Sequence, residues 1–479
     1  VTFTCTCGLW FFIFNRSVQP LRMTEKVQDV LIEIDEIREQ HLGNEIEVHG
    51  FVESMKNFPK FGFLTLRAGV CRLQCVFNLG GKVDEEHFTQ ICGVSLESYV
   101  RITGVLKKAH KPIKSCSVSK YELEVSELEV LSAAGSLPFD LKDINVYKKG
   151  VPNVSFNKRL DYRVLDLRGT MSQSIFRIID QIMFTFRTFL RNEKFVEIKT
   201  PKLLGSASEG GANLFEVNFF KKKAYLAQSP QLYKQMAIIG NLRRVYEIGH
   251  VYRAEESNIN RYLSEFIGLD LEMESTDYLK TIRMIYSMLC AIIRDVYENN
   301  RQDVENLRKY NDFEDLRFED EPLILSHREC VDILKEHGED IKYEDDFSRF
   351  MEKRLGTIIA ETKKIDFFVV KDYPTRNRPF YTATCADPFY SKSYDFILRG
   401  EEILSGAQRI NSYEQLRQSA INNGIDPVSI EGYLGAFKYG APPHAGCGIG
   451  LERFAKALFG SSDIRCFNIF PRDPGRLYP

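Results

Sequence analysis

Residues 243–273 read RRVYEIGHVYRAEESNINRYLSEFIGLDLEM, two strand-like runs joined by a polar loop. Side chains alternate between the two faces of a strand, so the first run places Val251, Arg253 and Glu255 together. The returning run buries an apolar residue at every second position and presents the opposite set, Phe266, Gly268, Asp270 and Glu272. An arginine beside carboxylates and an aromatic ring suits a nucleotide. An ion-paired sheet face without a ligand explains the same residues.

The segments around this hairpin predict an α+β domain over residues 161–479, with a mainly antiparallel sheet flanked by helices. Thr170 and Gln173 have the spacing of a capping box at the start of a helix. The following residues, 175–189, carry an apolar stripe at helical spacing. We therefore expect a long helix to pack against the sheet.

The N-terminal part of the chain has a different pattern. From residue 45 to about residue 131, short alternating runs predict a five-stranded β-barrel, an OB-fold. In the run 61–67, Leu64 and Leu66 point inward while Phe63 points outward, and Gln74 points outward from the next strand. We expect this domain over residues 23–135, with a short helix at 24–40, and a hinge containing proline and glycine at 136–160.

Composition limits the remaining choices. A 479-residue chain with 44% hydrophobic residues is long enough for several globular domains. Because its net charge is only −2, any nucleic acid would have to bind a local basic patch rather than a chain that is basic overall. The 11 cysteines include no Cys-x-x-Cys pair, which disfavours zinc sites and disulfide frameworks. The apolar run 9–14 is too short to cross a membrane, and we expect no membrane association. Residues 1–22 are expected to be a non-native or disordered leader before Met23, with a targeting segment as the alternative.

Three motifs, in order, resemble those of class II aminoacyl-tRNA synthetases. KFVEIKTPKL, residues 194–203, resembles motif 1, and YRAEESNINRYLSEF, residues 252–266, resembles motif 2. GCGIGLERF, residues 446–454, resembles motif 3. A lone glycine-rich motif is weak, but three ordered motifs across most of the domain are specific. The resemblance implies an N-terminal anticodon-binding OB-fold and a class II catalytic domain.

The resemblance implies that ATP binds on the sheet face of the hairpin. Arg253 would contact the α-phosphate and the substrate carboxylate and, with Arg453, act in catalysis. Phe266 and Arg453 would enclose the adenine ring, and Arg261 would reach the γ-phosphate. Glycines of motif 3 would let the backbone approach the nucleotide where a Cβ would block it. The implied ATP site comprises Arg253, Ala254, Glu255, Arg261, Tyr262, Leu263, Phe266, Glu402, Gly450, Leu451, Glu452 and Arg453.

Two further segments, QSPQLYKQ (228–235) and SGAQR (405–409), resemble the aspartyl-tRNA synthetases within this family. Lys234 and Arg409 can supply the positive charge that an aspartate side chain requires. Asp270 would balance the substrate ammonium or orient Lys234. Asparagine would leave a buried cation without its anion, at a cost of roughly 3–5 kcal/mol. The implied aspartate site comprises Glu209, Gln231, Lys234, Arg253, Asp270, Ser405 and Arg409.

Glu402 and Ser405 occupy the positions at which the family binds a divalent cation, and oxygen ligands suit Mg²⁺. The small-residue segment 205–215 resembles the family's mobile loop, from which Glu209 would close on the substrate ammonium. No residue is an obvious nucleophile. This agrees with a reaction in which the aspartate carboxylate attacks the α-phosphate and the tRNA 3′-terminal hydroxyl then attacks the adenylate.

The barrel carries the expected RNA contacts. FGFLTLR, residues 61–67, resembles the family's anticodon-binding strand. Phe63 would stack on an anticodon base, and Gln74 and Glu122 would read base edges, although an incidental exposed phenylalanine is the simpler alternative. A cluster of lysines without intervening acids suits a phosphate backbone; its members are Lys107, Lys108, Lys111 and Lys114.

We therefore expect a cytoplasmic homodimer, with Pro201 of motif 1 at the dimer interface, that charges tRNA(Asp) using ATP and Mg²⁺. Two alternatives remain open, an asparaginyl-tRNA synthetase and a non-catalytic, synthetase-like RNA-binding paralogue. An amide-forming asparagine synthetase of similar fold is disfavoured because it would not use the barrel. Motif 1 has Lys194 where the family has glycine, which leaves the local backbone geometry open. Whether tRNA(Asn) is also charged does not follow from the sequence.

Overall fold

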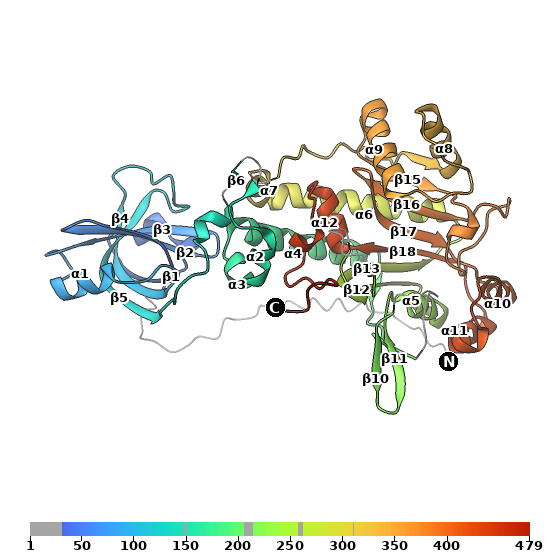
Figure 1. Cartoon of the computed structure of the whole chain (residues 1–479), viewed down its shortest axis with the longest axis horizontal. Helices are drawn as coiled ribbons and strands as arrows, with labels where there is room; N and C mark the ends of the chain where they lie inside the picture. The colour runs from blue at the N-terminus through green and yellow to red at the C-terminus, as the bar shows by residue number, and fades with distance from the viewer. Residues whose placement is uncertain (1–30, 146, 149–150, 206–213, 257–261, 310) are drawn as a thin grey trace, which may run out of the picture. The chain divides into compact units, whose positions relative to one another are not determined.

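The computed structural model describes residues 31–145, 147–148, 151–205, 214–256, 262–309 and 311–479. The chain divides into two compact units, Val1–Leu137 and Pro138–Pro479, whose elements are labelled in Figure 1. None of the helices in the described part of the chain has the length and apolarity needed to span a membrane. The predicted leader, residues 1–22, lies outside the described residues.

The first unit is a closed five-stranded barrel, which confirms the predicted OB-fold. Neighbouring strands follow the order β1-β2-β3-β5-β4, and helix α1 (Glu85–Cys92) lies between β3 and β4 in the chain. The barrel strands are β1 (Glu45–Asn57), β2 (Phe61–Ala68), β3 (Cys71–Asn78), β4 (Tyr99–Lys108) and β5 (Tyr121–Ser132).

Alternation along the barrel strands separates core from surface as the sequence predicted. Leu64, Leu66 and Leu73 are buried in the barrel core, whereas Phe63 and Gln74 remain partly exposed. The predicted helix at 24–40 is wrong over its described part, which contains two short 3-10 turns, Ile34–Glu36 and Glu39–His41. Ile34 and Ile37 are buried against the barrel core, so tertiary packing rather than helix propensity sets the backbone here.

The second unit is built on an eight-stranded sheet in the order β14-β15-β16-β17-β18-β13-β12-β8. The end pairs, β14–β15 and β12–β8, are parallel, and the inner pairs are antiparallel. This confirms the mainly antiparallel α+β domain. The strands are β8 (Val196–Glu197), β12 (Arg244–Tyr252), β13 (Glu265–Glu274), β14 (Ile324–Ser326), β15 (Phe367–Lys371), β16 (Ser393–Leu398), β17 (Glu401–Gln408) and β18 (His444–Gly450).

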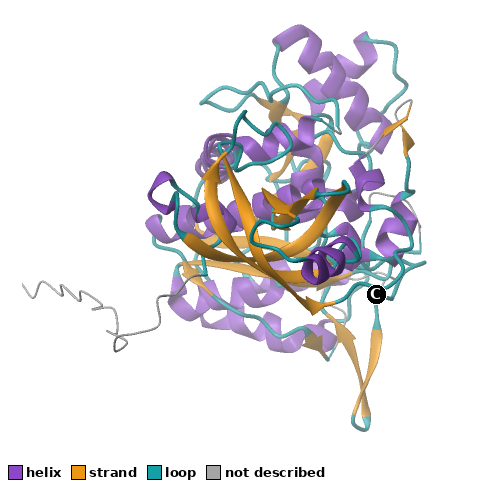
Figure 2. Cartoon of the chain, turned by 90° about the vertical axis from the view of Figure 1, so that its left-hand side faces the viewer, coloured by secondary structure: helices purple, strands orange, loops and turns teal. Residues whose placement is uncertain are grey.

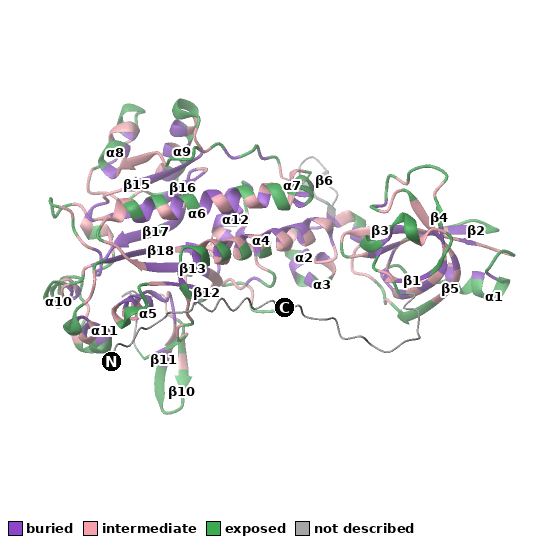
Figure 3. Cartoon of the chain, turned by 180° about the vertical axis from the view of Figure 1, so that it is seen from behind, coloured by how far each residue is buried: buried purple, intermediate pink, exposed green. Residues whose placement is uncertain are grey.

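Long helices share one hydrophobic core with this sheet. Ile182 and Ile285 from two of the helices pack in the same cluster as Leu269 of β13 and Ile449 of β18. Figure 3 shows buried residues filling the central strands and alternating with exposed ones along α6. The helices of this core are α4 (Thr170–Asn192), α6 (Tyr278–Asn299), α7 (Arg301–Arg308) and α12 (Leu451–Leu458).

Two local predictions in this unit have different outcomes. Helix α4 begins at Thr170, but Gly169 is its N-cap and no capping box forms, because Thr170 already lies in the first turn. Gln173 instead donates to the carbonyl of Leu167 at 2.7 Å. Lys194 has φ 63°, the left-handed conformation that glycine adopts most easily. The position therefore has a backbone conformation that suits glycine, although the residue is lysine.

The remaining elements are short or lie outside the central layers. A three-stranded sheet of β10, β11 and β9 contains a hairpin that extends away from the body of its unit (Figures 1 and 2). These elements are β6 (Tyr147–Lys148), β7 (Val151–Pro152), α2 (Phe156–Asp161), α3 (Arg163–Asp166), β9 (Leu203–Leu204), β10 (Glu216–Phe219), β11 (Lys222–Leu226), α5 (Gln231–Ala237), α8 (His327–Glu336), α9 (Arg349–Lys363), α10 (Tyr413–Asn422) and α11 (Glu431–Ala436).

Candidate active site

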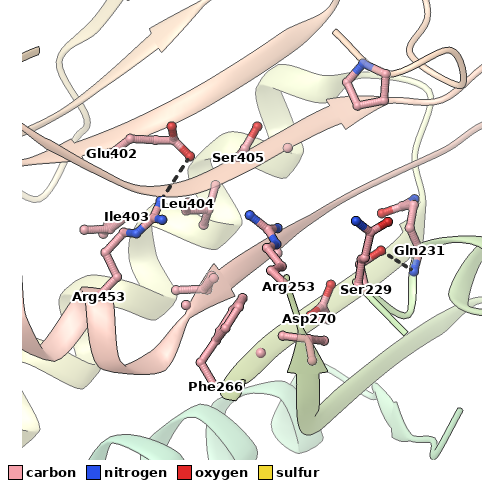
Figure 4. A pocket seen from close by; sticks show the side chains of 18 of the residues that line it. Ser229, Gln231, Arg253, Phe266, Asp270, Glu402, Ile403, Leu404, Ser405 and Arg453 are labelled. Atoms are coloured by element: carbon pink, nitrogen blue, oxygen red, sulfur yellow. Dashed lines mark hydrogen bonds and ion pairs between the residues drawn. The ribbon is translucent and has the colours of Figure 1, made fainter. Parts of the chain in front are cut away.

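A cavity of about 310 Å³ opens on the face of the eight-stranded sheet opposite the long helices. Strands β12, β13, β17 and β18, the start of α12 and the segment before α5 all contribute to its lining. Figure 4 shows Glu402, Arg453 and Phe266 toward one end, with Ser229 and Gln231 toward the other. The predicted residues that line it are Gln231, Arg253, Glu255, Tyr262, Leu263, Phe266, Asp270, Glu402, Ser405, Arg409, Gly450, Glu452 and Arg453.

The β12–β13 hairpin brings an arginine and an aromatic ring together as the alternation predicted. Val251 pairs with Phe266, and just beyond the pair the amide of Arg253 donates to the carbonyl of Ser264 at 3.0 Å. The Arg253 guanidinium carbon lies 5.5 Å from the centre of the Phe266 ring. Glu452 accepts the amide of Ile267 at 3.1 Å, which fixes the strand beneath Phe266. The hairpin thus presents a cation and a flat apolar surface to the cavity.

A bulge in β17 places two oxygen-bearing side chains, those of Glu402 and Ser405, on the same face. Residues three apart in a regular strand face opposite sides, but Ile403 is an extra residue between the pairs of β17 with β16. The bulge brings Glu402 onto the face that also carries Ser405 and Arg409. Glu401 turns away and forms an ion pair with Lys456, both oxygens lying 2.7 Å from Nζ.

Arg409 is buried, yet part of its guanidinium remains available to a ligand. Its Nε and Nη2 donate to the carboxylate of Glu272 at 2.9 and 3.2 Å, and Nη2 also bonds Gln231 and the carbonyl of Gly446. Among the described residues, none accepts a hydrogen bond from Nη1 of Arg409. Arg409 lines the cavity, and a guanidinium nitrogen without a protein acceptor can donate to a carboxylate.

Lys234 lies beside this network but does not line the cavity. Its Nζ donates to Asp270 at 3.0 Å and to the carbonyls of Leu271 and Cys447 at 3.3 and 2.8 Å, so its three donors are used. Glu272 lies 3.5 Å from the same Nζ and therefore links Lys234 to Arg409. The structure thus joins the two predicted cations through a buried carboxylate whose linking role the sequence did not reveal.

Burial and charge act in opposite directions on the two acidic residues of this network. Burial raises the pKa of Glu272, but Arg409 and Lys234 outweigh it and hold that pKa below its ordinary value. Burial also raises the pKa of Asp270, and here the single ion pair with Lys234 does not reverse the increase. A carboxylate that is poorly compensated in this way favours an additional positive group in the cavity, such as an ammonium.

Arg378 and Asp395 were missed by sequence reasoning. Arg378 has a side chain that is only 9% exposed and lines the cavity; it donates to Asp395 at 3.1 and 2.7 Å and to the hydroxyl of Ser405 at 3.2 Å. Its guanidinium lies 3.8 Å from the centre of the Tyr373 ring. The available signal was an arginine directly before Pro379 in an apolar segment, RPFY, which carries no periodicity.

Two carboxylates, of Asp395 and Glu352, and two guanidinium groups, of Arg453 and Arg378, act on Glu402 in opposite directions. Burial is the main cause that raises its pKa, to about 7; Asp395 and Glu352 add to the increase, and both arginines oppose it. The Nη1 atom of Arg453 lies 3.9 Å from Glu402, the contact drawn in Figure 4. Mg²⁺ takes few protein ligands and retains water, so the carboxylate of Glu402 and the hydroxyl of Ser405 on one face fit it. No group of three or more His, Cys, Asp or Glu side chains suited to a metal occurs in the described residues.

Several predicted residues lie elsewhere. Glu209 and Arg261 fall outside the described residues. Ala254 and Leu451 are neighbours in sequence of cavity residues but do not line the cavity themselves. Pro201 is exposed, between β8 and β9.

The motif 3 glycines act mainly on the protein's own chain. A Cβ at Gly446 would lie 2.2 Å from the carbonyl oxygen of Leu271 and 2.3 Å from the carboxylate of Glu272. At Gly450 it would make an ordinary 3.5 Å contact with Arg453. The close approach that requires glycine is therefore between β18 and β13, beneath the cavity.

The barrel places its predicted RNA-contacting residues on one outer face. Thr65 of β2 pairs with Gln74 of β3, and Gln74 pairs with Glu122 of β5. The Gln74 amide donates to Glu122 at 2.9 Å. Phe63 is the next outward residue of β2, so the three predicted residues form a continuous strip. Of the predicted lysines, Lys107 pairs with Glu124 at 2.6 Å.

Residues 155–474 match the family model described as tRNA synthetases class II (D, K and N). The chain belongs to this family. Residues 46–131 of this class II synthetase match a second model, the OB-fold nucleic acid binding domain. The family accounts for the ordered motifs on β8, β12–β13 and β18–α12.

Individual relatives show which members of the family this class II synthetase is most similar to among those compared below. It is 49% identical to a protein of Encephalitozoon cuniculi named "Probable aspartate--tRNA ligase, cytoplasmic", over 96% of this chain and 99% of the relative. A putative aspartyl-tRNA synthetase from Leishmania major Friedlin has a TM-score of 0.89 at 32% identity, covering 96% of this chain and 97% of that one. Asparaginyl-tRNA synthetase from Pyrococcus horikoshii, solved with asparaginyl-adenylate, has a TM-score of 0.83 at 29% identity, covering 95% and 100%.

Proposed function

We propose that the chain is a cytoplasmic, ATP-dependent aspartate–tRNA ligase that forms aspartyl-adenylate and transfers the aspartyl group to tRNA(Asp). The observation that carries this proposal is Arg409, whose Nε and Nη2 are held by Glu272, Gln231 and Gly446 while Nη1 remains for a ligand. A buried guanidinium of this kind selects a carboxylate. The 49% identity to a cytoplasmic aspartate--tRNA ligase over nearly the whole chain supports the same substrate.

Selection of aspartate over asparagine follows from the unbalanced charge that asparagine would leave. The side-chain carboxylate of aspartate would bind Nη1 of Arg409, and the substrate ammonium would lie near Asp270. Lys234 positions Asp270 and helps to balance Glu272 rather than binding the substrate directly. Loss of the substrate anion beside a buried cation costs roughly 3–5 kcal/mol, or on the order of 10²- to 10³-fold or more in discrimination.

ATP would occupy the end of the cavity that contains Phe266, Arg253 and Arg453. Phe266 and Arg453 would enclose the adenine ring, and Arg253 would stabilise charge on the α-phosphate as the aspartate carboxylate attacks it. Glu402 and Ser405 would hold Mg²⁺, which offsets phosphate charge when it is bound. Glu209 and Arg261 complete the proposed set, closing on the ammonium and the γ-phosphate.

The barrel would bind the anticodon and the second unit would carry out the chemistry. Phe63 would stack on one anticodon base while Gln74 and Glu122 read the edge of another. We propose a homodimer with Pro201 at its interface, which light scattering on the purified protein tests. A monomer at all concentrations would contradict that assembly without affecting the proposed reaction.

The experiment that tests the function is amino-acid-dependent ATP–pyrophosphate exchange with each of the twenty amino acids. We expect exchange with aspartate, and exchange with asparagine lower by at least about 100-fold. A preference for asparagine would make the chain an asparaginyl-tRNA synthetase. Absence of exchange with every amino acid, together with retained tRNA binding, would indicate the non-catalytic paralogue.

A further inference from the structure

Two exposed phenylalanines and a partly exposed one form a cluster at one end of the barrel that we call the aromatic ridge: Phe58, Phe61 and Phe63. Phe58 lies in the β1–β2 loop and is 45% exposed, and Phe61 at the start of β2 is 39% exposed. The rings of Phe58 and Phe61 are stacked, with centroids 4.7 Å apart and planes at 18°. The Phe63 ring meets Phe61 edge-on at 5.7 Å.

The aromatic ridge is not needed to close the β1–β2 turn. The turn is already closed by the backbone, because the amide of Phe58 donates to the carbonyl of Phe61 at 2.8 Å. Stacking covers one face of each ring in the Phe58–Phe61 pair and leaves apolar surface to water. Neither ring belongs to the buried barrel core. Large exposed apolar groups that are clustered in this way mark a contact surface.

The position of the ridge continues the strip of predicted RNA-contacting residues. Residues two apart in a strand share a face and lie about 7 Å apart, so Phe61, Phe63 and Thr65 point outward in a row. Gln74 and Glu122 flank the row at Thr65, whereas Phe58 and Phe61 lie at its opposite end. The strip therefore has a hydrogen-bonding end, Phe63 in the middle, and a stacked aromatic pair.

Lysines beside the ridge give it the charge that a nucleic acid requires. Lys56 pairs with Phe63 across β1 and β2, and directly opposed residues project to the same face. Lys56 and Lys60 are exposed, and neither forms an ion pair with any residue that the structure describes. Aromatic surface with unneutralised basic side chains is typical of single-stranded nucleic-acid binding, and the β1–β2 loop is a common contact in OB-folds.

We propose that Phe58 and Phe61 bind a second single-stranded base of the tRNA, the neighbour of the base stacked on Phe63. This inference rests on the proposed function, because it takes the RNA to be the tRNA that the chain charges. The outer face of the Phe58–Phe61 pair receives the base, and Lys56 and Lys60 contact the adjoining phosphates. The barrel thus holds consecutive anticodon-loop nucleotides along one strip, with hydrogen-bond readout at one end and stacking at the other.

The test uses the full chain and compares Phe58→Leu, Phe61→Leu and the double variant in tRNA charging. Leucine preserves apolar packing but removes the flat ring. We expect the KM for tRNA to rise at least about 5-fold in the double variant. Aspartate-dependent exchange without tRNA should be unchanged, and Phe61→Tyr should behave like the unmodified protein. Phe350→Leu is the matched control, because Phe350 is a 63% exposed phenylalanine on α9 of the other unit.

Abasic substitutions at each anticodon-loop position of a tRNA transcript locate the base. At one position, the abasic substitution should weaken tRNA binding by the unmodified protein. The same substitution should cause no additional loss of affinity in the Phe58→Leu/Phe61→Leu variant. The inference would be overturned by an unchanged KM for the double variant, or by equal losses of affinity at every abasic position in both proteins. Normal aspartate-dependent exchange would in that case leave the proposed function intact. Loss of exchange in the unmodified protein would instead overturn the proposed function.

Discussion

The cavity of the second unit and the outer strip of the barrel are built in opposite ways. At the cavity, Arg409 and Asp270 of the lining join Glu272 and Lys234 behind it in one buried network of ion pairs. On the barrel, the residues proposed to recognise RNA are partly exposed rings and the Gln74–Glu122 pair at the surface. A preorganised buried network gives large discrimination because any mismatch leaves a charge unpaired. Exposed stacking adds smaller increments, one base at a time.

The largest effect should come from breaking the buried network with Arg409→Leu. This variant removes the proposed ligand of the aspartate carboxylate and leaves Glu272 with Lys234 as its remaining close cation. We expect aspartate-dependent exchange to fall below detection and the unfolding free energy to decrease by roughly 3–5 kcal/mol. Exchange assays and urea unfolding measure the two consequences.

A double variant separates the catalytic from the structural effect. Arg409→Leu/Glu272→Gln also removes the buried carboxylate that has lost its closer cation, so it should recover part of the lost stability but none of the exchange activity. Size-exclusion chromatography should give the same assembly state as for the unmodified protein. Exchange at the unmodified rate in either variant would contradict the role given to Arg409.

The second effect is the loss of stability at low pH, which should be larger in the second unit than in the barrel. His327 of α8 is fully buried against Phe347 and Tyr373, and burial lowers its pKa to about 4. Its unfolded pKa is about 6.5, so acidification protonates the unfolded state first, and the unfolding free energy falls as pH drops from 6.5 to 4. The histidines of the barrel, by contrast, are not buried. Acid should therefore weaken the second unit before the barrel.

His327→Phe measures this contribution. Between pH 7 and pH 4 the unmodified protein should lose about 3 kcal/mol more unfolding free energy than the variant. The lost hydrogen bond from Nε2 to the Asp345 carbonyl lowers the variant's stability equally at both pH values. Urea unfolding of the second unit across this range is the measurement, and parallel pH profiles would contradict it.

The two regions also differ in how much of them the sequence predicted. Period-two alternation predicted the faces of the barrel strands and of the β12–β13 hairpin, because each strand has one buried and one open face. The bulge at Ile403 depends on how β17 pairs with β16, and the place of Arg378 in the cavity depends on its bond to Asp395. Both involve segments that are separate in the sequence. The cavity position of Arg409 was inferred from the motif SGAQR, but its bond to Glu272 joins residues 137 positions apart. Local patterns carry no information on such contacts.

Phe63→Ala should have a smaller effect, confined to the RNA. Loss of one stacked base costs roughly 1–3 kcal/mol, so the KM for tRNA should rise about 5- to 150-fold. Exchange without tRNA should be unchanged, because Phe63 belongs to the barrel and the cavity to the second unit. Parallel kinetics of charging and exchange test this. An equal loss of both activities would contradict the division of tasks between the two regions.

The smallest effect should separate two neighbouring lysines at the end of β4. Lys107 is already paired with Glu124 at 2.6 Å, whereas Lys108 forms no ion pair with the residues that the structure describes. A lysine that neutralises a phosphate releases counterions, so Lys108→Ala should reduce the salt dependence of tRNA binding by about 0.7–1 in the slope of log K against log salt. Lys107→Ala should reduce it less, because Glu124 competes with the phosphate for the ammonium. Equal reductions would mean that the Lys107–Glu124 pair opens when tRNA binds. An ion pair would then take part in binding on the barrel, as ion pairs do in the network at the cavity.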